Sequence, residues 1–337
     1  RDFTMNAIAL HLPEGNIIDP FDGRSDIKRK IIRTVGNPRE RFGEDGLRPV
    51  RAIRFSAQLD FSLEENTLNA IPQALPVTEG IATERFRDEF IKMLGAETPS
   101  KALLLMETTG LLALFLPELA ACRGVEQKGF HRFDVLDHLL YSCDGAPRSS
   151  LRLRLTALFH DIGKPAVRAL KDGVCTFYRH EDISASMTEA ILTRLRFPKA
   201  IIREVTHLIA NHMFHYEESW TDAAVRRFLV RVTPEAVDDL FDLRYADLYG
   251  MNGTPPPPGI LAGFEERIRK VLEQQSALGL KDLAVNGKDL MTMGIPAGKQ
   301  LGIVLNELLE TVLDDPGSNT RENLLVIAEK MYHRISG

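Results

Sequence analysis

Residues 151–165 read LRLRLTALFHDIGKP, and this stretch decides how the middle of the chain folds. Apolar residues recur through 151–159, which predicts a largely buried helix. The adjacent pair His160–Asp161 stands at its end, because Gly163 and Pro165 follow and both favour helix termination. Neighbouring side chains on a helix point about 100° apart, yet both can reach one ion beside the helix end. The stretch therefore predicts a metal site on a helical body.

Further histidines and aspartates lie on both sides of this pair. His138 falls in an amphipathic segment upstream, and His180, His212 and Asp247 follow downstream. Mixed imidazole and carboxylate ligands suit a divalent transition metal such as Mn, Ni, Fe or Co, or else Mg²⁺. Such an ion polarises a phosphoryl oxygen and lowers the pKa of a bound water. A lone histidine on an apolar helix is more often a core residue than a ligand, so the prediction rests on the combination.

The sequence HDIGK at 160–164 and its flanking residues resemble the HD superfamily of metal-dependent phosphohydrolases. The resemblance implies four core metal ligands, namely His138, His160, Asp161 and Asp247. It implies two extra ligands of the kind found in members that hold two metals, namely His180 and His212. Lys164 would contact substrate phosphate as a point charge, so the expected catalytic residues are His160, Asp161 and Lys164. The remaining histidines of the region are expected to be spectators, namely His131, His207 and His215.

The front of the chain predicts a small mixed region followed by helices. Residues 3–10 are a strand candidate, 13–16 a turn, and a second strand starts at Ile17. After Asn37–Pro38 the apolar spacing becomes helical and stays so. Four consecutive prolines in GTPPPPG at 253–259 cannot lie in a helix interior, which predicts a linker or an ordered loop. The fold class is therefore mainly α with a small α/β part at the N-terminus.

Composition sets broad limits on the class of protein. Of 337 residues, 44% are hydrophobic and 26% charged, which is ordinary for a soluble chain of two or three domains. No apolar run approaches the roughly 20 residues of a membrane span, and no signal peptide is visible. Three widely spaced cysteines argue against a disulfide framework, which favours a cytoplasmic protein. The first residue is not Met, so we expect the chain to begin inside a longer protein.

Net charge is −5, but the N-terminal third contains a basic segment. Between Arg24 and Arg54 ten Lys/Arg residues stand against four Asp/Glu. A local basic surface can bind phosphate groups on an acidic protein, because salt screens the distant repulsion. The alternative is a solvated charged surface without a ligand.

Several motifs at the front occur in a specific order. RDFTMNA at 1–7 is followed by DPFDGRSD at 19–26, EDGLRPVRAIRF at 44–55 and ERFRDE at 84–89. Their order and spacing are similar to those of the class II tRNA nucleotidyltransferases, the family of bacterial CCA-adding enzymes and poly(A) polymerases. The similarity continues through PEL at 117–119 and the glycine-punctuated stretch 287–302.

This resemblance implies roles for the front residues. Asp45 and Arg48 would select the incoming base in place of a nucleic-acid template, because carboxylate acceptors and guanidinium donors suit the base edge that C and A share. Three residues apart, they are expected on one helix face; the alternative is an ordinary surface ion pair. Arg1, Asp2 and Asn6 would surround the ribose and triphosphate, and Arg51 and Arg54 would reach phosphate groups. The resemblance also implies a brace for the template helix, formed by Glu84, Arg85 and Glu89.

The 337 residues differ from the family at one place. Members begin with a glycine-rich loop and an Asp-x-Asp pair that holds two Mg²⁺ ions, and neither precedes the RDFTMNA motif here. This chain is therefore expected to be a fragment that binds nucleotide poorly and adds none, whereas a longer natural protein would use CTP, ATP and Mg²⁺. An HD segment without a basic C-terminal arm favours CCA addition to tRNA over poly(A) synthesis.

The expected organisation has four parts. They are the end of a nucleotidyltransferase head (1–36), a helical neck with the template (37–125), an HD domain (126–252) and a helical tRNA-binding tail (260–337). Expected partners are tRNA, CTP and ATP without a membrane, and the oligomeric state stays open. Alternatives are a stand-alone HD phosphohydrolase, a poly(A) polymerase relative, and a tRNA-binding protein with decayed catalytic sites.

Overall fold

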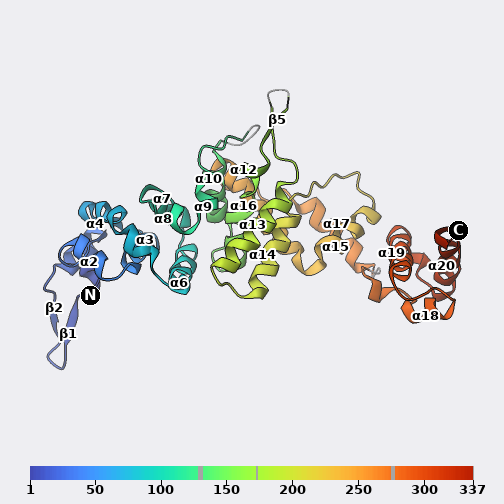
Figure 1. Ribbon diagram of the computed structural model, residues 1–337, viewed down its shortest axis with the longest axis horizontal. Coiled ribbons are helices and arrows are strands. Elements are labelled where there is room, and N and C mark those ends of the chain that lie inside the picture. Colours follow the sequence, from blue (N-terminus) through green and yellow to red (C-terminus); the bar gives the residue numbers. More distant parts are fainter. Residues whose placement is uncertain (128–131, 172–173, 275–277, 337) are drawn as a thin grey trace. The chain divides into compact units, whose positions relative to one another are not determined.

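The computed structural model describes residues 1–127, 132–171, 174–274 and 278–336 and is mainly helical, as predicted (Figure 1). In these ranges the strands form three separate two-stranded sheets. The chain divides into two compact units. The first unit contains Arg1–Met213 and Asp239–Pro256, and the second contains Phe214–Asp238 and Pro257–Gly337. None of the helices in the described ranges combines the length and apolar character that a bilayer crossing requires.

The first unit begins with a hairpin, drawn in blue in Figure 1, rather than with one long strand. The predicted strand at 3–10 is wrong over Thr4–Asn6, which form a 3₁₀ turn, because the Asn6 amide turns back to donate to the Asp2 carboxylate. The predicted turn and second strand are confirmed by the antiparallel pairing of β1 with β2. The elements here are η1 Thr4–Asn6, β1 Ala9–His11, β2 Asn16–Ile18, α1 Gly23–Arg29 and β3 Ile31–Ile32, which pairs in parallel with β4 Ser62–Leu63.

Helices follow from Pro38, where the helical pattern was predicted to begin. The Asn37 side chain accepts from the Arg39 N–H, and proline suits the first helical position. Phe86 and Phe90 are fully buried in the core beneath these helices. The elements are α2 Pro38–Glu44, α3 Leu47–Leu59, α4 Glu65–Ala70, η2 Pro72–Ala74, α5 Leu75–Glu79, α6 Thr83–Leu94, α7 Pro99–Thr108, α8 Leu111–Phe115 and α9 Pro117–Ala120.

The rest of the first unit is built on helices that pack closely around α11. Gly145 and Gly250 permit the close approach of α10 to α16, since a Cβ atom on Gly250 would lie 2.0 Å from Ser142 Oγ. The elements are α10 Val135–Gly145, α11 Leu151–Phe159, α12 Lys164–Val167, β5 Ala169–Lys171, β6 Val174–Thr176, α13 His180–Arg194, α14 Lys199–Asn211 and α16 Val237–Asn252.

The second unit has a core of its own. Tyr216 stacks on Phe264 with ring centroids 4.3 Å apart, and Val304, Leu308 and Leu324 are fully buried. The four prolines at 255–258 lie between α16 and α17, where one unit ends and the other resumes. The elements are α15 Asp222–Val232, η3 Pro234–Ala236, α17 Ala262–Glu273, η4 Leu280–Asp282, α18 Gly287–Thr292, α19 Lys299–Asp314, η5 Pro316–Ser318 and α20 Arg321–Ser336.

Candidate metal centre and nucleotide-selecting residues

Five separate places in the first unit bring six histidines and aspartates together. His138 lies on α10, and His160 and Asp161 follow the last residue of α11 directly. His180 is the first residue of α13, and His212 follows α14. Asp247 lies on α16. The apolar run of α11 is buried, so the helix presents the His–Asp pair at its C-terminal end, as predicted.

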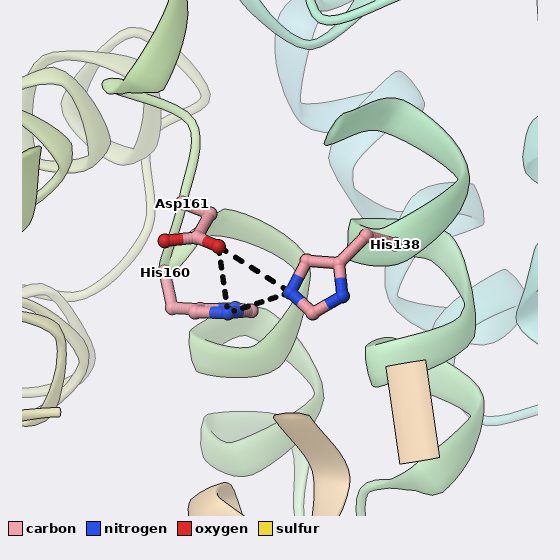
Figure 2. A group of neighbouring side chains, drawn as sticks. All are labelled: His138, His160 and Asp161. Carbon is pink, nitrogen blue, oxygen red and sulfur yellow. Dashed lines mark hydrogen bonds and ion pairs between the residues drawn. The ribbon is translucent and has the colours of Figure 1, made fainter. Parts of the chain in front are cut away.

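His138, His160 and Asp161 form a first cluster at Asp161 Oδ2, and Asp247 adjoins it. His138 Nε2 lies 3.2 Å from His160 Nε2 and 3.3 Å from Asp161 Oδ2 (Figure 2). Asp247 Oδ1 lies 3.3 Å from His138 Nε2 and 3.5 Å from His160 Nε2. The ligand atoms of His138, His160 and Asp161 thus lie within 4.8 Å of one another, and an oxygen of Asp247 contacts both imidazoles.

The other oxygen of Asp161 belongs to a second cluster. His180 Nε2 lies 3.0 Å from Asp161 Oδ1, and His212 Nε2 lies 3.6 Å from the same oxygen. Asp161 therefore faces the first cluster with Oδ2 and the second with Oδ1, as a carboxylate shared by two ions would.

Backbone hydrogen bonds fix the orientation of three of the imidazoles. Nδ1 lies 2.9 Å from the Ala157 carbonyl in His160, 2.8 Å from the Phe177 carbonyl in His180 and 2.7 Å from the Ile209 carbonyl in His212. A carbonyl only accepts, so Nδ1 carries a proton in each ring and Nε2 is the nitrogen that faces the cluster. This arrangement is typical of metal-ligating histidines.

The electrostatics of the clusters favour a positive charge between the side chains. Burial alone would raise the pKa of Asp161, but the Lys164 ammonium and the His160 imidazole hold it well below its usual range. Burial would lower the pKa of His160, yet Asp161 and Asp247 raise it to about 10. Burial lowers the pKa of His212, which keeps that ring neutral and able to bind a metal.

The donor set fits divalent metal ions. Asp161 Oδ1 and His180 Nε2 are buried 3.0 Å apart, yet neither forms a hydrogen bond to the other or to another described residue, an arrangement that costs free energy unless a cation satisfies it. His138, His160 and Asp161 are at most 3% exposed. A pocket of about 580 Å³, within the usual range for small-molecule sites, opens onto both clusters. The arrangement can hold two ions and admit a phosphate ester.

Two residues of this site were not predicted from the sequence. Arg244 lines the pocket and donates to Asp247 Oδ2 at 3.0 Å, and Gln127 Oε1 accepts from Lys164 Nζ at 2.5 Å. Arg244 could have been found, because it precedes a proposed ligand by three residues on one helix. Gln127 carries no such signal, since it is 37 residues from its partner. Of the expected spectators, His215 is exposed beside Glu217 and His207 lies within α14, whereas His131 is outside the described residues.

The proposed triphosphate-binding residues at the front also meet. The Asp2 carboxylate accepts from Asn6 Nδ2 at 3.0 Å and from Arg51 Nε at 2.8 Å. Burial would raise the pKa of Asp2, but these hydrogen bonds and that of the Phe3 N–H outweigh it and lower the pKa. Arg1 is exposed at the start of the same segment.

Asp45 and Arg48 do not share a helix face, so that expectation is wrong. Asp45 is extended, with φ −152° and ψ 110°, and links α2 to α3, whereas Arg48 is the second residue of α3. The reason is local, because Asp45 Oδ1 accepts from the Leu47 N–H and so ends one helix and begins the next. Their side chains have other partners, since Arg85 donates to Asp45 Oδ2 and Arg48 donates to Glu44.

Arg54, expected to reach a phosphate group, is buried and has partners inside the protein. Its guanidinium forms a buried ion pair with Glu89 at 2.5 Å and also donates to Gln58. Glu89 and Arg85 both lie on α6, so this helix contacts the 45–54 segment at two points, consistent with a brace. Glu84 differs from that expectation, because it pairs with Arg196 beyond α13 instead.

Four family models match successive parts of the chain. They are the poly A polymerase head domain over residues 1–33, the probable RNA and SrmB-binding site of polymerase A over 60–123, the HD domain over 130–250, and the putative domain 2 of tRNA nucleotidyltransferase over 260–328.

Similar proteins cover nearly the whole chain. The A-adding tRNA nucleotidyltransferase of Deinococcus radiodurans is 37% identical over 328 residues, which span 92% of this chain and 73% of that protein. The CC-adding enzyme of Thermus thermophilus is 32% identical and spans 92% and 71%. The crystal structure of the Bacillus stearothermophilus CCA-adding enzyme in complex with CTP superposes with a TM-score of 0.70 at 28% identity, covering 100% of this chain and 73% of that one. The chain therefore belongs to the class II tRNA nucleotidyltransferases, the family of bacterial CCA-adding enzymes, and carries an HD domain within that framework.

Proposed function

We propose that this protein works in the addition of C and A to the 3′ end of tRNA from CTP and ATP, and that its HD domain hydrolyses phosphate esters. The observation that carries the proposal is the similarity along nearly the whole chain to enzymes that extend tRNA ends. Nucleotidyl transfer would use Mg²⁺, because metal-bound carboxylates neutralise the charge that develops on the transferred phosphate.

Asp45 and Arg48 select the base. The Arg85 guanidinium and the Leu47 N–H outweigh burial and lower the pKa of Asp45, so this carboxylate is an acceptor at neutral pH. Arg48 supplies donors from the first turn of α3. Cytosine and adenine each present an amine donor beside a ring-nitrogen acceptor, which this pair matches. Arg1, Asp2, Asn6 and Arg51 hold the ribose and triphosphate.

The HD domain binds two divalent ions. His138, His160, Asp161 and Asp247 hold the first, and His180 and His212 hold the second with the shared Asp161. Mn, Ni, Fe, Co or Mg²⁺ suits these ligands, and the bound metal would supply a nucleophilic water and polarise the phosphoryl oxygen. Lys164 places a positive charge where substrate phosphate enters. Suitable substrates are 2′,3′-cyclic or 2′-phosphate esters of nucleotides or tRNA.

The four functional parts are the head segment 1–36, the neck 37–125, the HD domain 126–252 and the tail 260–337. The family models over 1–33, 60–123, 130–250 and 260–328 support this division. The tail would bind tRNA through its shape and backbone, which needs no reading of sequence.

The test of transfer uses the protein as its gene encodes it, with tRNA that lacks its last three nucleotides. Sequencing the 3′ ends after incubation with CTP, ATP or both should show CCA. A product of CC or of A alone would instead group the protein with its CC-adding or A-adding relatives, and a poly(A) tail would overturn the assignment. Asp45→Ala with Arg48→Ala should abolish the preference for C and A over G and U; retained preference would exclude this pair.

The HD site is tested on the 337-residue chain through its metal content. Elemental analysis should find up to two transition-metal ions per chain, and His160→Ala with Asp161→Ala should remove both. His215→Ala is the matched control, because that histidine is exposed and outside the clusters. Hydrolysis of a 2′,3′-cyclic nucleotide by the metal-loaded chain, without transfer by the gene-encoded protein, would favour a stand-alone phosphohydrolase.

A further inference from the structure

Lys164 holds a position at the metal clusters that its expected role on substrate phosphate does not explain. Its ammonium lies 2.5 Å from Asp161 Oδ2 and 2.5 Å from Gln127 Oε1, and the residue is only 7% exposed. The Phe177 ring is also near, with its centroid 5.6 Å from Nζ. Lys164 thus forms an ion pair with Asp161, a proposed metal ligand, and the Gln127 amide and the Phe177 ring lie beside its ammonium.

The oxygen that Lys164 contacts is the one that faces the first cluster. Asp161 Oδ2 is also 3.3 Å from His138 Nε2 and 3.4 Å from His160 Nε2. An ammonium and a divalent ion bound at this oxygen repel each other strongly, since both are buried and only a few ångströms apart. Asp161 Oδ1, which faces His180 and His212, lies on the other side of the carboxylate.

We infer that Lys164 competes with the metal for Asp161 Oδ2 and so weakens metal binding at the first cluster more than at the second. This inference rests on the proposed metal site. The lysine stabilises the buried Asp161 carboxylate while the metal is absent, and it is repelled toward the pocket when a metal binds. The pocket is where substrate phosphate enters, so metal loading makes the ammonium available to the substrate.

A lysine that served only the substrate would behave differently. Its removal would slow hydrolysis and leave metal affinity unchanged. A lysine that only oriented Asp161 would also be distinguishable, because its removal would weaken metal binding. Competition alone predicts that loss of the positive charge tightens metal binding.

The experiment titrates Mn²⁺ into the 337-residue chain by calorimetry and compares wild type with Lys164→Met. The variant should bind Mn²⁺ at the first cluster at least about tenfold more tightly, from the repulsion of two close charges. The same comparison in a His180→Ala background measures Mn²⁺ binding at the first cluster alone, because His180 belongs to the second cluster. Lys101→Met is the matched control, because Lys101 makes a similar 2.6 Å contact with Asp60 but is exposed and outside the clusters.

Thermal unfolding gives a second measurement, because the effect of the substitution on the melting temperature should differ with and without the metal. In chelator the melting temperature of Lys164→Met should fall, because Asp161 loses its nearest cation. With saturating Mn²⁺ this loss should shrink or reverse. Lys164→Gln, which keeps a hydrogen-bond donor without the charge, should change metal affinity in the same direction and serves if the methionine variant does not fold.

The outcomes separate the two hypotheses. Wild type that binds no Mn²⁺ overturns the proposed metal site itself. Wild type that binds Mn²⁺, with variants that bind it equally or more weakly, overturns only the competition by Lys164.

Discussion

At the scale of single residues, Glu89 shows how burial decides what an ion pair contributes. One carboxylate oxygen faces Arg54, whose side chain is 9% exposed, and the other faces Lys92, which is 50% exposed. The Arg54 pair is shielded from solvent on both sides, whereas the Lys92 ammonium is largely hydrated. The two pairs share one carboxylate, so they form a matched comparison.

We expect Arg54→Ala to lower the free energy of unfolding by about 3–5 kcal/mol, because it leaves a buried carboxylate without its main partner. Lys92→Ala should cost at most about 1 kcal/mol, as for other exposed pairs. Urea unfolding followed by circular dichroism measures both. Equal losses would mean that the Arg54 pair is as well screened as a surface pair.

Asp2 predicts a pH dependence of stability. Its pKa is lowered in the folded protein from an ordinary value of 3.8, because the hydrogen bonds from Asn6, Arg51 and the Phe3 N–H together outweigh burial. A depressed carboxyl pKa stabilises the fold above the unfolded pKa, and this contribution is lost as pH falls through the folded pKa.

Asp2→Asn should therefore lower the free energy of unfolding by about 1.5–3 kcal/mol at neutral pH, as expected for hydrogen bonds to a charged group. The difference from wild type should stay constant above about pH 5 and shrink below the unfolded pKa. Urea unfolding of both proteins at several pH values measures it. A difference that grows on acidification would contradict the assignment.

At the scale of elements, helices with strong local signals could be predicted, as could the turn at 13–16 and the strand after it, whereas the first residues of the chain could not. The apolar run before His160 and the proline after Asn37 place α11 and α2 correctly, because both signals act within a few residues. Thr221 caps α15, with its side chain accepting from the Ala224 N–H, which is another signal that acts within one turn. The strand predicted at 3–10 failed because the Asn6–Asp2 hydrogen bond favours a turn over local strand propensity.

In the candidate site, too, some features could be predicted from local sequence signals and others could not. The meeting of its six histidines and aspartates could be predicted from the HD motif and the histidine intervals. The extended conformation of Asp45 could not, because its spacing from Arg48 suits one continuous helix equally well, and only the structure shows its carboxylate accepting from the Leu47 N–H. Nor could the role of Gln127, which comes from a distant segment of the chain.

The crossing of α10 with α16 controls the first cluster, since one helix carries His138 and the other Asp247. A Cβ atom on Gly250 would lie 2.7 Å from the His138 carbonyl oxygen and closer still to Ser142 Oγ. Gly250→Ala must therefore push the two helices apart and displace Asp247, which lies about one turn away.

We expect Gly250→Ala to weaken Mn²⁺ binding at the first cluster by about 10–100-fold, as when the supporting residues of a metal site are lost. Binding at the second cluster should change less, because its two histidines lie on α13 and beyond α14. Gly43→Ala is the control, since nothing lies within 4 Å of the added atom in α2. Metal titration distinguishes the variants, and equal loss at both clusters would indicate general unfolding instead.

At the scale of the whole molecule, the two units interleave along the chain. The proline-rich stretch at 253–259 could be predicted as a boundary, but residues 214–238 group with the C-terminal unit. Their placement rests on aromatic contacts across long sequence separations, such as Phe214 and Phe228 with Phe264, at centroid distances of 6.1 and 5.1 Å. The spacing of hydrophobic residues along the sequence indicates which residues are buried, but not which residues they pack against.

This division predicts how metal removal affects stability. Both clusters lie in the first unit, so a bound ion stabilises that unit by about 2.7 kcal/mol at a free concentration of 100 times its Kd. Calorimetry with Mn²⁺ and with chelator should show two transitions, of which only one shifts. Leu308→Ala identifies the other, because this fully buried leucine belongs to the second unit and its loss costs about 2–5 kcal/mol. If the chelator shifted both transitions equally, the units would unfold together, and the metal would stabilise the whole chain.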